Sequence, residues 1–174
     1  MRTPTNVAGA KKICIVGRAG SGKSYLATRL GELLNLPVIY MDIEFWLPNW
    51  EHVDRETLYN NVTAKMGDSW IIDGGYLGNE PLLEYRFALA DLIIHIDVPI
   101  KECIKNAKTR RNQPRPDFPH FLDESNDNEF AGLIELIETW EERSTRMFEL
   151  IDPAKLLTLK GKSQVDAFLA ALSG

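Results

Sequence analysis

Short apolar runs alternate with longer amphipathic stretches along the whole chain. Apolar runs of about four to six residues predict buried strands, and longer stretches with a 3.6-residue period predict helices. Alternation of the two is typical of repeated βαβ units around a parallel sheet. The pattern therefore predicts an α/β fold with three layers, in which helices flank a five-stranded parallel sheet.

The predicted strands cover 12–16, 38–41, 69–72, 92–96 and 155–159. The predicted helices cover 22–34, 54–65, 79–90, 99–111 and 128–150, and a last helix starts from Ser163. Asp54 is the expected cap of the second helix, and Ser163 with Asp166 resembles a capping box for the last one. Residues 1–10 are predicted to be a disordered lead-in, and 11–174 to form a single domain.

The composition is ordinary for one globular domain, with 174 residues of which 44% are hydrophobic and 26% charged. It excludes collagen-like, disordered and disulfide-rich classes. Cys14 and Cys103 have no Cys or His at ligand spacing, so we expect both to pack as small apolar residues. No apolar run approaches the ~20 residues that cross a bilayer, and residues 1–6 lack the apolar stretch of a signal peptide. We therefore expect a cytoplasmic protein without a membrane segment.

The segment after the first predicted strand, Gly17 to Ser24, fits the pattern G-x-x-x-x-G-K-S at every fixed position. Its glycines let backbone N–H groups turn inward around phosphate oxygens, and the helix that follows adds its positive N-terminal dipole. We expect Lys23 on the β- and γ-phosphates of a nucleotide and the Ser24 hydroxyl on Mg²⁺. The residues expected to hold the nucleotide are Gly17, Ala19, Gly20, Ser21, Gly22, Lys23, Ser24 and Tyr25.

Two aspartates end predicted strands, where open α/β folds bind ligands. Asp73 follows Trp70-Ile71-Ile72 and is expected to hold Mg²⁺ together with Ser24 and to border the substrate; the alternative is a turn-forming aspartate. Asp42 follows the second strand and is expected to orient an acceptor hydroxyl or take its proton; the alternative is an Asx turn or a helix cap.

An aromatic loop and a group of arginines complete the candidate site. Phe45, Trp46 and Trp50 follow Asp42 closely and form either an apolar slot for a ring or plain core packing. Arg110, Arg111 and Arg115 lie where a cover over the phosphates would fit, and an arginine fork suits the charge on a moving phosphoryl group. A solvated helix face is the alternative for these arginines.

These features together resemble the adenylate kinase-like P-loop kinases, and more closely the DNA topology modulation proteins, which are related to adenylate kinase. The segments that carry the resemblance are Gly17–Ser24, Tyr40–Asp42, Phe45–Trp50, Trp70–Tyr76, Ala90–Pro99, Arg110-Arg111 and Arg115–Asp117. The resemblance covers about residues 12 to 170. It implies a fold of the nucleoside and nucleotide kinase type, ATP with Mg²⁺ as the phosphoryl donor, and a short lid around 110–125.

The sequence departs from adenylate kinases after the third strand. Asp73-Gly74-Gly75-Tyr76-Leu77 stands where they have Asp-Gly-Phe-Pro-Arg, so the arginine that would grip an acceptor phosphate is missing. Arg86, one helix further on, is the expected substitute. We expect the acceptor to lie near Asp42, Trp46, Trp50 and Tyr76.

The leading hypothesis is a kinase that transfers the γ-phosphoryl group of Mg-ATP to a small acceptor, such as a nucleoside, a nucleotide or a similar metabolite. The alternatives are a nucleotide-binding regulator of the DNA topology modulation type and an NTPase without an acceptor. No Asn-Lys-x-Asp guanine reader occurs, which argues against a GTPase switch. A net charge of −5 argues against direct binding of nucleic acid.

Overall fold

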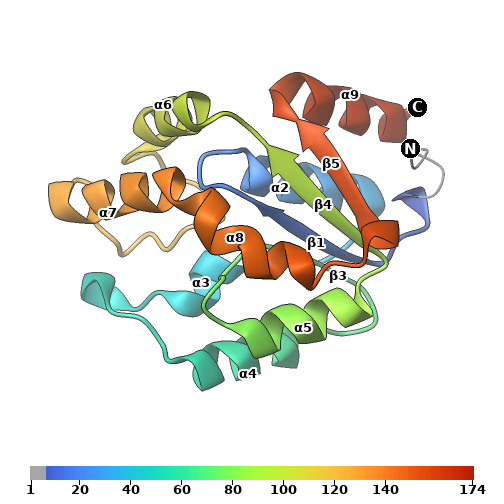
Figure 1. Ribbon diagram of the computed structural model, residues 1–174, viewed down its shortest axis with the longest axis horizontal. Helices are drawn as coiled ribbons and strands as arrows, with labels where there is room; N and C mark the ends of the chain where they lie inside the picture. The colour runs from blue at the N-terminus through green and yellow to red at the C-terminus, as the bar shows by residue number, and fades with distance from the viewer. Residues whose placement is uncertain (1–6) are drawn as a thin grey trace.

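Five parallel strands form the centre of the computed structural model, which describes residues 7–174 (Figure 1). The strands are β1 (Lys12–Gly17), β2 (Val38–Tyr40), β3 (Trp70–Asp73), β4 (Leu92–Asp97) and β5 (Leu156–Lys160). Their order across the sheet is β2-β3-β1-β4-β5. Ile15 pairs with Asp73 of β3 on one side and with Ile94 of β4 on the other, so β1 is the central strand. The predicted five-stranded parallel sheet is confirmed.

Helices connect the strands. They are α2 (Lys23–Leu34), α3 (Met41–Phe45), α4 (Arg55–Lys65), α5 (Glu80–Leu89), α6 (Ile100–Arg110), α7 (Asp127–Glu138), α8 (Trp140–Glu149) and α9 (Gly161–Ser173). Two short 3₁₀ turns, η1 (Pro48–Trp50) and η2 (Pro153–Lys155), lie in the connections. The predicted cap of α4 is confirmed, since Asp54 accepts a hydrogen bond from the Thr57 backbone N–H at 2.7 Å.

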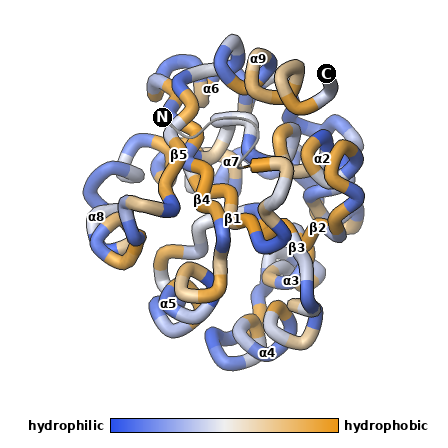
Figure 2. Tube along the Cα trace, turned by 90° about the vertical axis from the view of Figure 1, so that its right-hand side faces the viewer, coloured by the Kyte–Doolittle hydropathy of each residue, from blue (hydrophilic) through white to orange (hydrophobic). Residues whose placement is uncertain are grey.

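Two apolar cores lie on the two faces of the sheet, because successive strand residues point to opposite sides. Ile13 and Ile15 face one core, which is closed by α2, α6, α7 and α9. Cys14 and Val16 face the other, which is closed by α4, α5 and α8. Figure 2 shows the strands in the middle with helices on both sides. Both cysteines are buried and free, as predicted. A sheet covered on both faces explains why the interior positions of its strands are mostly apolar.

The single long helix predicted over 128–150 is two helices in the structure. It breaks at Thr139, where φ is −92° and ψ is 5°. Arg18 donates a hydrogen bond from Nε to the Ile137 carbonyl oxygen at 2.9 Å, and Trp140 packs into the second core. No Gly or Pro occurs from Leu133 to Leu150, so these tertiary contacts, not a local breaker, determine the break at Thr139.

Three smaller predictions are also wrong. The second strand ends at Tyr40, and Met41–Phe45, expected to be the end of that strand and a loop, form α3. Ser163 does not cap α9, because the helix begins at Gly161. The free N–H of Lys160 is instead satisfied by Gln164 Oε1 at 2.8 Å. Of the predicted disordered lead-in, residues 1–6 lie outside the described residues, whereas 7–10 are ordered, since Val7 and Ala10 are buried in the first core.

Candidate active site

The phosphate loop, Gly17–Ser24, joins β1 to α2 at the carboxyl edge of the sheet (Figure 1). Gly20 is its tightest position: φ is +77°, and a Cβ atom there would lie 2.2 Å from the carbonyl oxygen of Cys103 on α6. Asn106, also on α6, donates a hydrogen bond to the Gly20 carbonyl oxygen at 2.9 Å. Only glycine fits this conformation and this approach, so α6 fixes the course of the loop.

Lys23 is half-buried at the first turn of α2 and donates to the Arg18 carbonyl oxygen at 3.0 Å. Burial lowers the pKa of Lys23, and the nearby Asp73 carboxylate partly offsets this effect. A bound phosphate would favour the charged ammonium in the same way. The geometry therefore suits the predicted contact of Lys23 with nucleotide phosphates.

Asp73 and Ser24 meet next to Lys23. The Ser24 hydroxyl donates to Asp73 Oδ2 at 2.5 Å, whereas Oδ1 of the same carboxylate is buried without a hydrogen-bond partner among residues 7–174. Burial raises the pKa of Asp73 to about 6, although Lys23 and the Ser24 hydrogen bond oppose this change. A cation bound at the free oxygen would stabilise the ionised form of this buried carboxylate.

These two side chains fit Mg²⁺, which takes oxygen ligands and uses only one or two from the protein when phosphates are present. The part of the chain that the structure describes has no group of three or more His, Cys, Asp or Glu residues able to hold a metal. Phosphate and water oxygens would therefore complete the shell of a bound Mg²⁺. A metal at this point would satisfy the free Asp73 oxygen.

A cavity of about 660 Å³ opens beside the phosphate loop. Its volume is in the range of small-molecule pockets. Of the predicted nucleotide residues, Gly20, Ser21, Gly22, Ser24 and Tyr25 line this cavity, whereas Gly17, Ala19 and Lys23 do not. The cavity is also lined by residues that the sequence did not predict, among them Thr28, Asn106, Gln113, Lys162 and Val165. No local motif marks these residues, because they come from α2, α6, α9 and the segment after α6, which only the fold brings together.

The three predicted lid arginines differ in what they contact. Arg111 donates to the carbonyl oxygens of Glu124 and Ser125 and pairs with Asp127 at 2.8 Å. Its guanidinium also lies over the Phe130 ring at 4.3 Å. These contacts use the fork of Arg111 to fasten the lid to α7, and Arg111 does not line the cavity.

Arg110 and Arg115 both line the cavity. Arg115 pairs with Glu124 at 2.9 Å and with Asp117 at 3.4 Å. The backbone carbonyl oxygen of Arg110 accepts from the Gln113 N–H at 2.9 Å, but its guanidinium has no hydrogen bond or ion pair with any described residue. Burial lowers the pKa of Arg110, and the charge of Arg115 lowers it further. The Arg110 guanidinium also interacts electrostatically with Lys23 and with Asp42. Because it has no ion-pair partner, Arg110 is better placed than Arg115 to contact a phosphoryl group.

Asp42, which the sequence predicts to orient an acceptor hydroxyl, lies in α3. The Tyr76 hydroxyl donates a hydrogen bond to Asp42 Oδ1, so residues 34 apart in the sequence form a pair. Burial raises the pKa of Asp42, while Tyr76 and Lys23 lower it. A raised pKa makes the carboxylate a stronger base, which suits proton acceptance from a hydroxyl.

The aromatic loop packs as one cluster. Phe45 contacts Tyr76 and Trp46, each at a ring-centroid distance of 4.8 Å. Trp46 contacts Trp50 at 5.3 Å, and Trp50 contacts Phe118 of the lid at 5.9 Å. A continuous series of rings therefore connects the Asp42 pair to the lid.

Arg86 does not do what the sequence predicted. The residue is fully buried, and its guanidinium donates to the carbonyl oxygens of Gly74 and Gly75 at 2.6 and 2.5 Å. It also lies 5.1 Å from the centre of the Phe87 ring. Arg86 therefore stabilises the turn after β3 and is not available to bind an acceptor phosphate.

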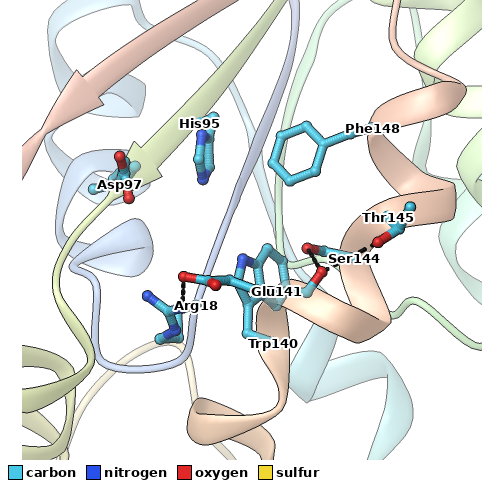
Figure 3. A pocket seen from close by; sticks show the side chains of 9 residues that line it. Arg18, His95, Asp97, Trp140, Glu141, Ser144, Thr145 and Phe148 are labelled. Carbon is cyan, nitrogen blue, oxygen red and sulfur yellow. Dashed lines mark hydrogen bonds and ion pairs between the residues drawn. The ribbon is translucent and has the colours of Figure 1, made fainter.

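A smaller cavity of about 190 Å³ lies between β4 and α8 (Figure 3). Arg18, buried at its edge, donates to the Val98 carbonyl oxygen at 2.9 Å and pairs with Glu141 at 3.1 Å. His95 meets the Phe148 ring edge-on at 4.9 Å, and burial lowers the pKa of His95. The Arg18 side chain thus ties the phosphate loop to the α7–α8 junction and is committed to that contact.

The fold of this chain is similar to that of solved kinase structures. The chain is similar to a shikimate kinase structure from Bacteroides thetaiotaomicron, with a TM-score of 0.59 and 16% identity over 94% of this chain and 97% of that chain. It is also similar to the shikimate kinase from Acinetobacter baumannii solved in complex with shikimate, with a TM-score of 0.60 and 15% identity over 97% of this chain and 94% of that chain. No protein-family model and no curated protein matches the sequence. Within residues 7–174, no helix has the length and apolar character needed to span a bilayer. The chain therefore shares the three-layer α/β fold of these two shikimate kinases.

Proposed function

We propose that this protein is an ATP-dependent kinase that phosphorylates a small metabolite. The observation that carries the proposal is the convergence of the phosphate loop, Lys23 and the Ser24–Asp73 pair beside a cavity of about 660 Å³. The fold shared with shikimate kinases supports it. A cytoplasmic location and membership of the DNA topology modulation group belong to the same proposal.

The nucleotide half acts by positioning charge. The N–H groups of the phosphate loop and the α2 N-terminus bind the phosphates, while Lys23 lies at the β- and γ-phosphates. Ser24 and Asp73 would hold Mg²⁺, which would neutralise charge on the phosphate oxygens when it is bound. Arg110 stabilises the charge on the phosphoryl group during its transfer.

The nucleophile is the hydroxyl group of the bound acceptor. The acceptor hydroxyl oxygen forms a bond to the γ-phosphorus, while the bond from that phosphorus to the β–γ bridging oxygen breaks and ADP leaves. Asp42 takes the proton of the hydroxyl, and Tyr76 holds the Asp42 carboxylate in place through its hydrogen bond. In each turnover the acceptor oxygen gains the phosphoryl group and loses its proton to Asp42.

The test is ADP release from Mg-ATP across a panel of nucleosides, nucleoside monophosphates, sugars and hydroxylated cofactors. We expect one acceptor to raise turnover at least ~100-fold, which corresponds to about 2.7 kcal/mol of barrier. Lys23→Ala should abolish the increase. Lys65→Ala, which removes an exposed lysine paired with Glu44 away from the phosphate loop, should retain it. A panel in which no acceptor stimulates turnover, although ATP binds, contradicts the proposal.

A further inference from the structure

One face of α6 borders the cavity beside the phosphate loop. Glu102, Asn106, Thr109 and Arg110 line this cavity, and their spacing places them on the same side of the helix. Asn106 is exposed, so its amide adds nothing to either apolar core. Within residues 7–174, it is the residue of this face whose side chain hydrogen-bonds to the phosphate loop, from Nδ2 to the Gly20 carbonyl oxygen at 2.9 Å.

The peptide group between Gly20 and Ser21 is hydrogen-bonded at both of its polar atoms. Its carbonyl oxygen accepts from Asn106, and its N–H, which belongs to Ser21, donates to the Arg18 carbonyl oxygen at 3.1 Å. Gly20 has a φ of +77°, and glycine has several accessible conformations, so Gly20 alone does not determine which way this carbonyl points. The hydrogen bond from α6 supplies that direction.

The Arg18 carbonyl oxygen extends this constraint to Lys23, because it accepts from Lys23 Nζ at 3.0 Å as well as from the Ser21 N–H. A continuous series of hydrogen bonds therefore connects Asn106 with the Lys23 ammonium. If the Gly20–Ser21 peptide turned over, the Arg18 oxygen would lose a donor, and the Gly20 carbonyl oxygen would point into the loop. Phosphate oxygens bind to N–H groups there, so an inward carbonyl oxygen would repel them.

We propose that Asn106 is a positioning residue for the nucleotide phosphates. Its amide keeps the Gly20 carbonyl oxygen turned toward α6, and it thereby keeps the loop N–H groups and the Lys23 ammonium in the arrangement that binds phosphate oxygens. The proposal rests on the proposed function for the presence of a nucleotide at this loop. It adds a residue that lies 86 positions after Gly20 in the sequence, outside the contiguous motif.

The experiment measures Mg-ADP binding by calorimetry for the intact wild-type chain and three variants. Asn106→Leu has a side chain of similar size without a donor, and we expect it to bind Mg-ADP about tenfold more weakly. Asn106→Asp places a carboxylate oxygen against the Gly20 carbonyl oxygen and should weaken binding further. Thr109→Val is the matched control on the same helix face, because the Thr109 hydroxyl donates to the Lys105 carbonyl oxygen at 3.0 Å. The affinity of this control should change less than about twofold.

A second probe separates positioning of the loop from direct contact with the nucleotide. Mg-tripolyphosphate carries phosphates without a base or a ribose, and its affinity is measured by competition with Mg-ADP. In Asn106→Leu the affinity for this probe should fall by the same factor as the affinity for Mg-ADP. The melting temperature of the ligand-free variant should stay within about 2 °C of the wild type, because the lost hydrogen bond belongs to an exposed side chain.

The outcomes distinguish this inference from the proposed function. Equal Mg-ADP affinities in the wild type and in Asn106→Leu overturn the positioning role and leave the nucleotide site intact. A loss confined to Mg-ADP also overturns it, because Asn106 would then contact the nucleoside directly. A wild type that binds no Mg-ADP contradicts both the inference and the proposed function, and one that binds Mg-ADP without tripolyphosphate overturns the inference alone.

The positioning role can also hold where the kinase fails. The expected losses of affinity, in a chain that phosphorylates no acceptor, support the role of Asn106 and contradict the kinase. Asn106→Asp answers the same question where Asn106→Leu fails to fold, since both variants remove the donor to the Gly20 carbonyl oxygen.

Discussion

The phosphate loop is one contiguous stretch of residues, 17–24, whereas the proposed acceptor side gathers Asp42, Tyr76 and Phe118 from three separate segments. The loop depends on glycine conformation and on the close approach of α6. The acceptor side depends on side-chain contacts across the fold. We therefore expect the phosphate loop to be most sensitive to substitutions that add atoms, and the proposed acceptor side to substitutions that remove side-chain contacts.

The largest expected effect comes from adding one methyl group to the loop. Gly20→Ala should lower the free energy of unfolding by about 4 kcal/mol, because the new Cβ would lie 2.2 Å from a backbone oxygen at a positive φ. Gly22→Ala is the matched control, since its φ is also positive but no atom lies within 4 Å; we expect about 1 kcal/mol. Urea denaturation measures both. Equal losses in the two variants would show that conformation alone, without the α6 contact, fixes the loop.

The second-largest expected effect comes from removing the contacts of Arg86 with the turn that follows β3. Arg86→Met should lower the free energy of unfolding by about 3 kcal/mol, because the carbonyl oxygens of Gly74 and Gly75 lose their buried donors. The turn that carries Tyr76 should loosen with them, so the KM for the acceptor should rise as well. Arg29→Met, which breaks only a surface pair with Glu32, should change stability by less than about 0.5 kcal/mol. A fully stable Arg86→Met protein would disprove this support role.

The third prediction concerns pH. The folded pKa of Asp73, about 6, lies above its ordinary value of 3.8, so its ionisation destabilises the ligand-free fold. This penalty is absent below about pH 4, grows as the pH rises, and is complete above about pH 6. Asp73→Asn should therefore raise the free energy of unfolding by about 2 kcal/mol at pH 7.5 and by nothing at pH 4.

Thermal unfolding of the two proteins across this pH range measures the difference. The same substitution should abolish phosphoryl transfer, because Ser24 loses the carboxylate that shares the metal with it. A variant that is less stable than the wild type at pH 7.5 would show that the carboxylate is already compensated within the fold.

The smallest expected effect lies in the lid. Glu124→Gln should weaken the pair with Arg115, in which both side chains are 15% exposed, and lower stability by about 1 kcal/mol. Because Arg115 lines the cavity, the KM for ATP should rise a few fold while the reaction at saturation changes little. Glu149→Gln, which removes an exposed partner of Arg146, should leave the KM unchanged. A lower rate at saturation with an unaltered KM would instead assign Arg115 to the transfer step.

Local patterns were sufficient for the features that neighbouring residues determine. The alternation of apolar runs predicted the sheet, and Asp54 three residues before Thr57 predicted the cap of α4. The phosphate loop was predicted because its glycines, Lys23 and Ser24 are contiguous and their roles depend on local backbone geometry. Asp73 was found at the end of a buried strand for the same reason, since strand ends meet at one edge of a parallel sheet.

The tertiary structure decided everything that depends on contacts between distant segments. Arg86 was predicted to reach an acceptor phosphate, but the turn at Gly74 and Gly75 captures it in the interior. Arg110, Arg111 and Arg115 are similar in sequence context, yet only their different partners in the folded lid distinguish them. The sequence alone determined the five strands, most of the helices along the chain and the phosphate loop, because hydrophobic period and glycine conformation are local. The fold determined which side chains meet, because a side chain's partner depends on packing between residues far apart in the chain.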